Sequence, residues 1–302
     1  MKKFITLFIV LLSTASMAQE YIAFQSRSNN VRAVIYFPEI KMEKYPLIIT
    51  QHGSRPTEKI GKCNLFGQGS ECAKTDVFSM TVIKQGLNAG FAVVAIDAFT
   101  DLGIDFNNKT TYPNAYFFAA DLRQRLQSDS RIDSANIFYT GWSYGGMAVM
   151  NSMRYPRLDQ WRATAPVETT CHYQPGARKL YYPTLYVFGE KSHFNPKPCV
   201  WLLDKLKDNG TQVEMIIVPN ANHNFGIGES RGGPARSLNG CADNHVITED
   251  SGWRRADGST IDRQTADKEC FTSVGYGSND FAKMDDAVSH VIKFFSKVQF
   301  RQ

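Results

Sequence analysis

One serine in the sequence stands in a pattern that produces a reactive hydroxyl. Residues 141–145 read Gly-Trp-Ser-Tyr-Gly, between the apolar stretch 137–139 and a segment of helical period at 147–153. A G-x-S-x-G sequence between a strand and a helix is typical of the nucleophile elbow, a strained turn that lifts the serine hydroxyl toward solvent. The pattern therefore predicts Ser143 as the nucleophile of an acyl-transfer reaction.

A serine nucleophile needs a base within hydrogen-bond reach, and histidine is the expected base. Of the six histidines, His223 lies in the short polar loop 219–225, directly after the apolar stretch 213–218. In a sheet that carries a nucleophile elbow, the histidine comes last in chain order and follows a late strand. We expect His223 to be the general base rather than a solvated loop residue.

An oxyanion hole needs two preorganised N–H donors. The elbow itself supplies the backbone N–H of Tyr144. The second donor should follow an earlier strand, and residues 46–51 run into His52-Gly53-Ser54, where the glycine allows the backbone to turn. The N–H of Ser54 or of Arg55 is the candidate.

Apolar stretches of strand character alternate with segments of helical period along most of the chain. This alternation predicts an α/β architecture with a doubly wound, mostly parallel sheet, and with the elbow it predicts the α/β-hydrolase fold. The expected strands are 31–37, 46–51, 91–96, 137–139, 163–167, 184–188 and 213–218, and the expected helices are 77–87, 115–126, 147–153, 200–206 and 281–298.

The chain is expected to begin with a secretory signal peptide, residues 1–18. Lys2 and Lys3 precede an apolar run at 4–12 and then a small-residue segment that ends at Ala18. The run is too short to span a bilayer about 30 Å thick, so we expect no stable membrane anchor and export to the periplasm or the medium. The formal net charge of +5, which falls when the two lysines are removed, gives no reason to expect nucleic acid as a partner.

The remaining residues, 19–302, fit one large α/β-hydrolase domain. Within it, residues 228–280 are rich in Gly, Ser, Asp and Arg and show little periodicity, so we expect an irregular excursion rather than a second domain. Six cysteines in an exported chain favour disulfides, and the absence of a C-x-x-C pair gives no sign of a metal site. The expected pairs are Cys63–Cys72, Cys171–Cys199 and Cys241–Cys270.

The chain resembles the dienelactone hydrolase family, particularly its exported esterase-like members. The resemblance covers residues 31–225 and rests on Gln-His-Gly at 51–53, Gly-Trp-Ser-Tyr-Gly-Gly at 141–146, Gly-Glu at 189–190 with Pro196 and Cys199, and Asn-His-Asn-Phe at 222–225. The founding members of that family use a cysteine nucleophile, whereas Ser143 stands here as in their esterase relatives. Their lactone substrate is therefore not expected for this chain.

The triad acid is a second departure from the family pattern. The family places it three residues after the glycine that ends the strand before the histidine, and this chain has Ser192 there. A serine cannot carry the charge that orients the imidazole and stabilises imidazolium. We favour Glu168, at the end of the strand that follows the nucleophile, with Glu190 as the alternative. A neutral hydrogen bond from Asn195 or His193 would also orient the imidazole, in a slower enzyme.

These residues together predict an exported serine hydrolase that cleaves a carboxylic ester or a related acyl bond through an acyl-serine intermediate. The expected substrate is a small-molecule or polymer ester, and the chemistry requires no metal or organic cofactor. Two alternatives stay open. One is a peptidase of the prolyl-oligopeptidase type, although such enzymes usually carry a large additional N-terminal domain. The other is a catalytically silent binding protein that keeps the fold.

Overall fold

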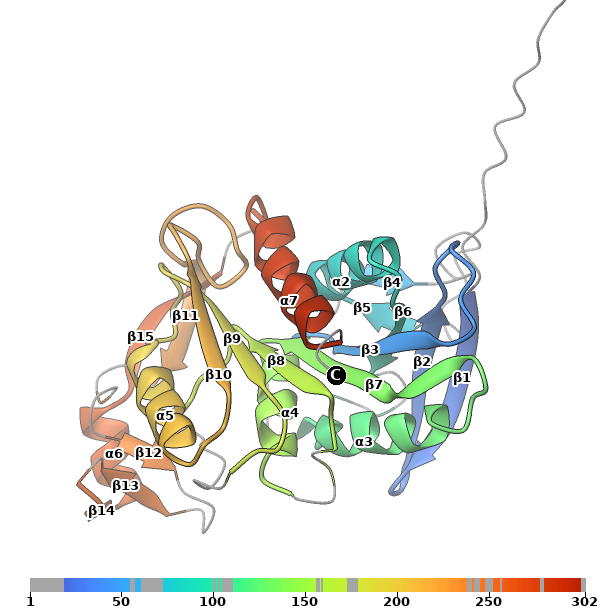
Figure 1. Cartoon of the computed structure of the whole chain (residues 1–302). Coiled ribbons are helices and arrows are strands. Elements are labelled where there is room, and N and C mark those ends of the chain that lie inside the picture. The colour runs from blue at the N-terminus through green and yellow to red at the C-terminus, as the bar shows by residue number, and fades with distance from the viewer. Residues whose placement is uncertain are drawn as a thin grey trace, which may run out of the picture.

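An eight-stranded sheet runs through the centre of the molecule (Figure 1). The computed structural model describes residues 19–54, 58–60, 73–99, 102, 104, 111–155, 158, 160–172, 179–237, 241, 245–247, 252–255, 257–277 and 280–299. The expected signal peptide and the expected Cys63–Cys72 pair lie outside these residues.

The sheet is mostly parallel, as predicted. The order across the sheet is β1 (Gln19–Ser26), β2 (Asn29–Tyr36), β6 (Ala92–Asp97), β3 (Tyr45–Gln51), β7 (Ile132–Trp142), β8 (Ala163–Val167), β9 (Thr184–Gly189) and β10 (Val213–Val218). From β6 to β10 in this order, all neighbouring strands pair in parallel, whereas β2 pairs antiparallel with both β1 and β6. The sequence did not predict β1, which is an edge strand with many exposed side chains.

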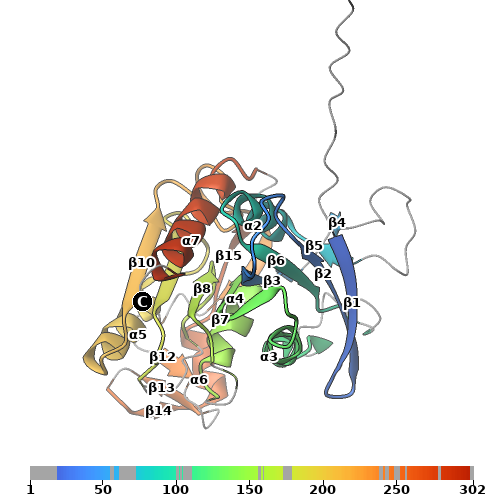
Figure 2. The same cartoon turned by 45° about the vertical axis from the view of Figure 1, so that its right-hand side comes forward.

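Helices cover both faces of the sheet (Figures 1 and 2). Neighbouring strand residues point to opposite faces, so that Ile48 packs with the helices of one face, whereas Ile49 packs with the helices of the other face. Apolar side chains are buried between sheet and helices on both faces, which gives the doubly wound arrangement that the sequence predicts. One face carries α2 (Val77–Asn88) and α7 (Met284–Gln299), and the other carries α3 (Ala115–Leu126), α4 (Tyr144–Ser152) and α5 (Lys197–Asp208).

The described residues between 231 and 277 form small sheets apart from the central one. The prediction of an irregular excursion was wrong in detail, because its described residues contain paired strands and a helix. Three of these strands have only two or three residues, too few to show a periodic pattern in the sequence. The disulfide Cys241–Cys270 is present as predicted, and it packs with the buried Ala266. The elements are β11 (Arg231–Ser237) paired with β15 (Thr272–Gly277), and β12 (His245–Ile247), β13 (Trp253–Arg255) and β14 (Thr260–Ile261) in a second sheet, with α6 (Arg263–Glu269). A further short pair is β4 (Glu58–Ile60) and β5 (Ala73–Thr75).

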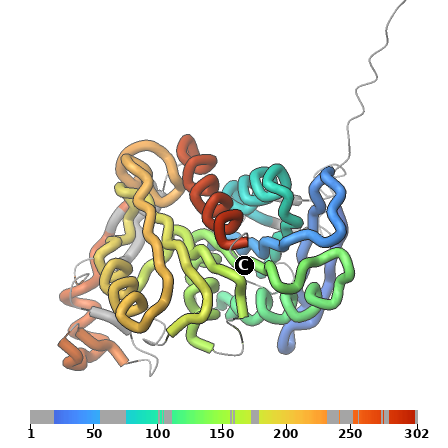
Figure 3. The backbone as a smooth tube through the Cα atoms, viewed as in Figure 1, coloured from blue at the N-terminus to red at the C-terminus, as the bar shows by residue number. Residues whose placement is uncertain are grey.

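The closing helix α7 lies beside α2, so the end of the described chain packs against an early helix (Figure 3). Its apolar face is buried, and the ring of Phe295 lies 4.8 Å from that of Phe138 on β7, between ring centroids. In the part of the chain that the structure describes, no helix combines the length and apolar character needed to cross a membrane.

The burial of Phe295 predicts a large stability loss when the ring is removed. Phe295→Ala should lower the free energy of unfolding by about 3–5 kcal/mol, because the side chain is fully buried and truncation leaves a cavity. Lys293→Ala, at an exposed position of the same helix, should change it by less than about 0.5 kcal/mol. Urea unfolding measures both, and equal losses would contradict the packing of α7 described above.

Candidate active site

The carboxyl ends of the parallel strands meet at one edge of the sheet, and three predicted site residues come together there. Ser143 follows β7, Glu168 follows β8, and His223 lies in the loop after β10. Nε2 of His223 is 3.1 Å from Oγ of Ser143, and Nδ1 of His223 is 2.9 Å from Oε2 of Glu168. The three side chains form a continuous chain of hydrogen bonds between residues from three different strand ends.

Ser143 occupies the strained turn that the sequence motif predicts. Its φ of 56° and ψ of −112° lie in a region that residues with a Cβ rarely adopt. Helix α4 begins at the next residue, earlier than the predicted residue 147, so the serine stands directly between strand and helix. A Cβ on Gly145 would lie 2.1 Å from the carbonyl oxygen of Gln51, which explains why this position of the motif is glycine.

The loop that carries His223 is held by its own polar groups. Oδ1 of the buried Asn222 accepts hydrogen bonds from the N–H groups of Asn224, at 3.0 Å, and of Gly226, at 3.1 Å. Phe225 is fully buried and anchors the loop in the core. The indole N–H of Trp142 donates to the carbonyl oxygen of His223 at 2.9 Å, which ties the loop to the elbow.

Three aromatic rings surround the imidazole of His223. Its ring centroid lies 4.4 Å from that of His193, 5.2 Å from that of Phe194 and 5.2 Å from that of Trp142. His223 is consequently only 6% exposed, and its ring has little freedom to rotate. Ser143 is only partly buried, so its hydroxyl lies at the solvent side of the hydrogen-bonded chain.

Glu168 is fully buried at the end of β8, with a φ of 47°. Its Oε1 accepts a hydrogen bond from the N–H of Gly189, and its Oε2 accepts one from the hydroxyl of Ser192. The pKa of Glu168 is raised to about 8, because the effect of burial exceeds the opposite effect of these two hydrogen-bond donors. A Cβ on Gly189 would lie 2.4 Å from the carbonyl oxygen of Ala221, so this glycine lets the end of β9 approach the histidine loop closely.

The structure also places the alternatives to Glu168, namely Glu190 as the acid and Asn195 or His193 as neutral partners. The carboxylate of Glu190 accepts a hydrogen bond from the N–H of Asn220 at 2.7 Å, and Oδ1 of Asn195 accepts one from the N–H of Lys197 at 2.9 Å. His193 contacts His223 through its ring face and edge. The carboxylate placed on Nδ1 of His223 is that of Glu168, the residue that the sequence favours for this position.

The expected oxyanion donors are the N–H of Tyr144 and an N–H of the loop that follows β3. Tyr144 is the first residue of α4, so its N–H has no acceptor within the helix. The N–H of Gly53 donates to the carboxylate of Asp76, the N-cap residue of α2, and is therefore engaged. Ser54, one of the two expected second donors, is half-buried, and its carbonyl oxygen accepts from the hydroxyl of Tyr112 at 3.4 Å. Arg55 lies outside the described residues.

The imidazole of His52 fixes the start of this loop. Its Nε2 accepts from the N–H of Ala98 at 3.0 Å, and its Nδ1 lies 2.7 Å from the carbonyl oxygen of Gly53. The two bonds together require the neutral tautomer that carries its proton on Nδ1. His52 is fully buried, so this histidine has a structural role.

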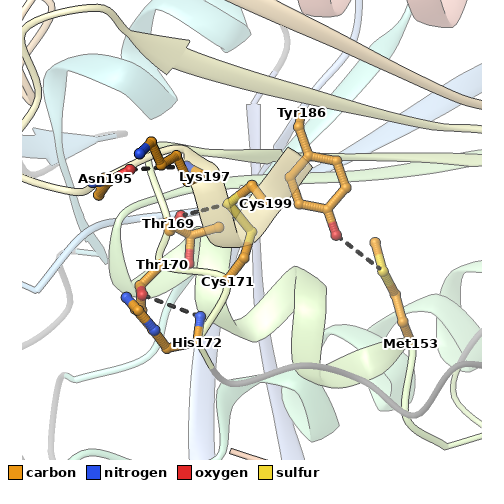
Figure 4. The surroundings of a disulfide bond; sticks show 9 residues. All are labelled: Met153, Thr169, Thr170, Cys171, His172, Tyr186, Asn195, Lys197 and Cys199. Atoms are coloured by element: carbon orange, nitrogen blue, oxygen red, sulfur yellow. Dashed lines mark hydrogen bonds between the residues drawn. A yellow bond between two sulfur atoms is a disulfide. The ribbon is translucent and has the colours of Figure 1, made fainter. Parts of the chain in front are cut away.

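The predicted disulfide Cys171–Cys199 lies beside the site (Figure 4). It joins the segment that follows Glu168 to the first turn of α5, and both cysteines are fully buried. Ser192 lies between β9 and α5. The disulfide therefore links the segment that contains Glu168 to the segment that contains Ser192, whose hydroxyl contacts the Glu168 carboxylate.

Sequence reasoning did not assign roles to three residues that support this arrangement. Ser192 drew attention only as a position where an acid is missing, although its hydroxyl contacts the acid that replaces it. The indole N–H of Trp142 gave no functional signal. Asp76 precedes an apolar helical segment, which is typical of an N-cap, so the sequence did contain a signal for its structural role.

Comparisons with known proteins support the fold of the chain. No family model matches it, and no curated protein matches it. Among solved structures, a putative dienelactone hydrolase from Klebsiella pneumoniae subsp. pneumoniae superposes with a TM-score of 0.53 and 14% identity, covering 69% of this chain and 88% of that one. Esterase 2 of Thermogutta terrifontis, phosphorylated by paraoxon, gives 0.52 and 14%, covering 68% and 84%.

The Pyrococcus horikoshii acylaminoacyl peptidase gives a TM-score of 0.51 and 15% identity, over 68% of this chain and 38% of that one. At these identities the comparisons establish the α/β-hydrolase fold. They do not distinguish between the esterase and peptidase members of the fold.

The raised pKa of Glu168 predicts an unusual dependence of stability on pH. Between about pH 4.5 and about pH 8 the folded chain keeps a proton on Glu168 that the unfolded chain has lost, so this group makes unfolding easier as the pH rises. Glu168→Gln removes that titration. The melting temperature of the variant, relative to wild type, should therefore increase from about pH 5 to about pH 8. A constant or decreasing difference in thermal denaturation would contradict the burial of an ionisable carboxyl.

Proposed function

We propose that this chain is an exported serine hydrolase that cleaves a carboxylic ester or a related acyl bond through an acyl-serine intermediate. The observation that supports the proposal most strongly is the hydrogen-bonded chain from Ser143 through His223 to Glu168. In the proposed roles, Ser143 is the nucleophile, His223 the general base and Glu168 the acid that orients and stabilises the imidazole.

The reaction begins with proton transfer from Ser143 to His223. As Oγ attacks the carbonyl carbon, Nε2 of His223 takes the hydroxyl proton over the 3.1 Å that separates the two atoms. The positive charge that develops on the imidazole is stabilised by the Glu168 carboxylate on Nδ1. The imidazolium then gives its proton to the leaving alcohol, and a water molecule activated in the same way releases the acyl group.

The negative charge that develops on the carbonyl oxygen requires donors at the elbow. The N–H of Tyr144 at the start of α4 is the first of them, with the added effect of the helix N-terminus. The N–H of Ser54 is the proposed second donor, since the N–H of Gly53 is bound to Asp76. Water is kept from His223 and Glu168 by the surrounding rings, which strengthens their electrostatic interaction.

The ionisation of Glu168 sets the expected pH range. The reaction needs an ionised Glu168 and a neutral His223, and burial raises the pKa of Glu168 to about 8. The fraction of the enzyme with an ionised Glu168 therefore increases as the pH rises toward 8 and above, and decreases as the pH falls. We expect the hydrolysis rate to be highest under mildly alkaline conditions.

The nature of the scissile bond is the finer part of the proposal. The esterase of Thermogutta terrifontis supports an ester, and the acylaminoacyl peptidase keeps a peptide bond as the alternative. The hydrogen-bonded chain from Ser143 through His223 to Glu168 is complete, which argues against a silent binding protein.

Export is supported by the disulfides Cys171–Cys199 and Cys241–Cys270, since such bonds persist mainly in oxidising compartments.

Hydrolysis of short p-nitrophenyl esters by matched variants tests these roles. Ser143→Ala should lower kcat by at least about 1,000-fold, and Glu168→Gln by about 100- to 10,000-fold, because nucleophile and acid act as a unit with His223. Glu190→Gln should keep the wild-type rate, because its side chain binds the Asn220 N–H and not His223.

Parallel assays with aminoacyl p-nitroanilides distinguish the two substrate classes. Turnover of the anilides but not of the esters would indicate a peptide-like substrate, and it would leave the proposed roles of the catalytic residues unchanged. An inactive Glu190→Gln variant beside a fully active Glu168→Gln variant would contradict the assignment of the acid.

A further inference from the structure

Both oxygens of the Glu168 carboxylate are held by the end of β9 and the residues that follow it. The N–H of Gly189 binds Oε1, and the hydroxyl of Ser192 lies 2.5 Å from Oε2. Oε2 is also the oxygen that lies 2.9 Å from Nδ1 of His223. Ser192 therefore touches the same atom that the imidazole touches.

The Ser192 hydroxyl has a fixed orientation. Its Oγ accepts a hydrogen bond from the N–H of Phe194 at 3.1 Å, and the N–H of Ser192 itself donates to the carbonyl oxygen of Gly189 at 3.1 Å. With a lone pair of the hydroxyl engaged, its hydrogen is directed to the acceptor that remains in contact, the Glu168 carboxylate. Ser192 thus acts as an oriented donor rather than a freely rotating hydroxyl.

The charge of Glu168 depends on such donors. Among the ion pairs of the described residues, the partner of Glu168 is His223. Lys191 pairs at the surface with Glu229, and the ring of His193 stacks edge-on against His223. A fully buried carboxylate without a lysine or arginine partner is stabilised by hydrogen-bond donors, and Ser192 supplies one of them.

We propose that Ser192 is a positioning residue, whose hydroxyl holds Oε2 of Glu168 against Nδ1 of His223 and favours the ionised carboxylate. This role of Ser192 rests on the proposed function of the site.

The position of Ser192 also predicts the effect of a carboxylate at this place. An aspartate at position 192 would place its carboxyl carbon near the present Oγ and extend its oxygens one bond further, toward the place that Oε2 of Glu168 now occupies.

The test measures kcat, KM and their pH dependence with p-nitrophenyl acetate for Ser192→Ala and Ser192→Thr. Ser192→Ala should lower kcat about tenfold, with a smaller change in KM, because it removes a hydrogen bond to a charged group. It should also shift the acidic limb of the pH–rate profile to higher pH by about one pH unit, because a hydrogen bond that lowers the pKa of Glu168 is lost. Ser192→Thr keeps a hydroxyl and should restore both values.

A second pair of variants tests the position itself. Glu168→Ala should be slow, and the double variant Glu168→Ala/Ser192→Asp should be at least about tenfold faster, because the new carboxylate reaches Nδ1 of His223. Ser192→Asp alone places two carboxylates at one site, which forces one to keep its proton, and it should not exceed wild type. Melting temperatures confirm that each variant is folded.

The outcomes separate this role from the function on which it rests. A folded Ser192→Ala variant with the wild-type kcat and pH profile would overturn the role of Ser192, as would a folded double variant no faster than Glu168→Ala. A Ser143→Ala variant as active as wild type would instead overturn the proposed function, and the role of Ser192 with it.

Discussion

The carboxylate of Glu168 is fully buried, and a buried carboxylate is stable only where donors surround it. Three segments meet around it, because Gly189 ends β9, Ser192 follows β9, and His223 lies in the loop after β10. Moving the end of β9 away would leave Oε1 without the N–H of Gly189, and moving the next residues would remove the Ser192 hydroxyl from Oε2. The close approach of β9 to the histidine loop, which requires glycine at position 189, is a consequence of this constraint.

Backbone strain is concentrated at the same place. Ser143 and Glu168, at adjacent strand ends, both have positive φ values, each at a cost of about 1–3 kcal/mol. The N–H of Ser143 donates to the carbonyl oxygen of Val167 at 2.9 Å, so the two strained residues are joined through the end of β8. A sheet packed on both faces, with the disulfide Cys171–Cys199 beside it, holds conformations that a short peptide would not keep.

The sequence predicted those parts of the site that depend on local pattern or chain order. The elbow at Ser143 has a motif, His223 is expected from its place after a late strand, and Glu168 from its place at a strand end. The role of Ser192 was not predictable in this way, because it depends on which strand ends lie side by side. Other strands were missed for different reasons: β1 is an edge strand with many exposed side chains, and β12, β13 and β14 have only two or three residues each, too few to show a periodic pattern. Among the described strands between residues 231 and 277, only the pairing of β11 with β15 joins segments distant in sequence.

The rate at which a fluorophosphonate modifies Ser143 tests the central claim most directly, because the reaction needs an activated serine and does not depend on the natural substrate. Mass spectrometry locates the adduct and follows its formation in wild type and in Glu168→Gln. We expect one adduct per chain, on Ser143, forming at least about 100-fold more slowly in the variant. Equal rates in the two proteins, or an adduct on another residue, would show that Glu168 and His223 do not activate this serine.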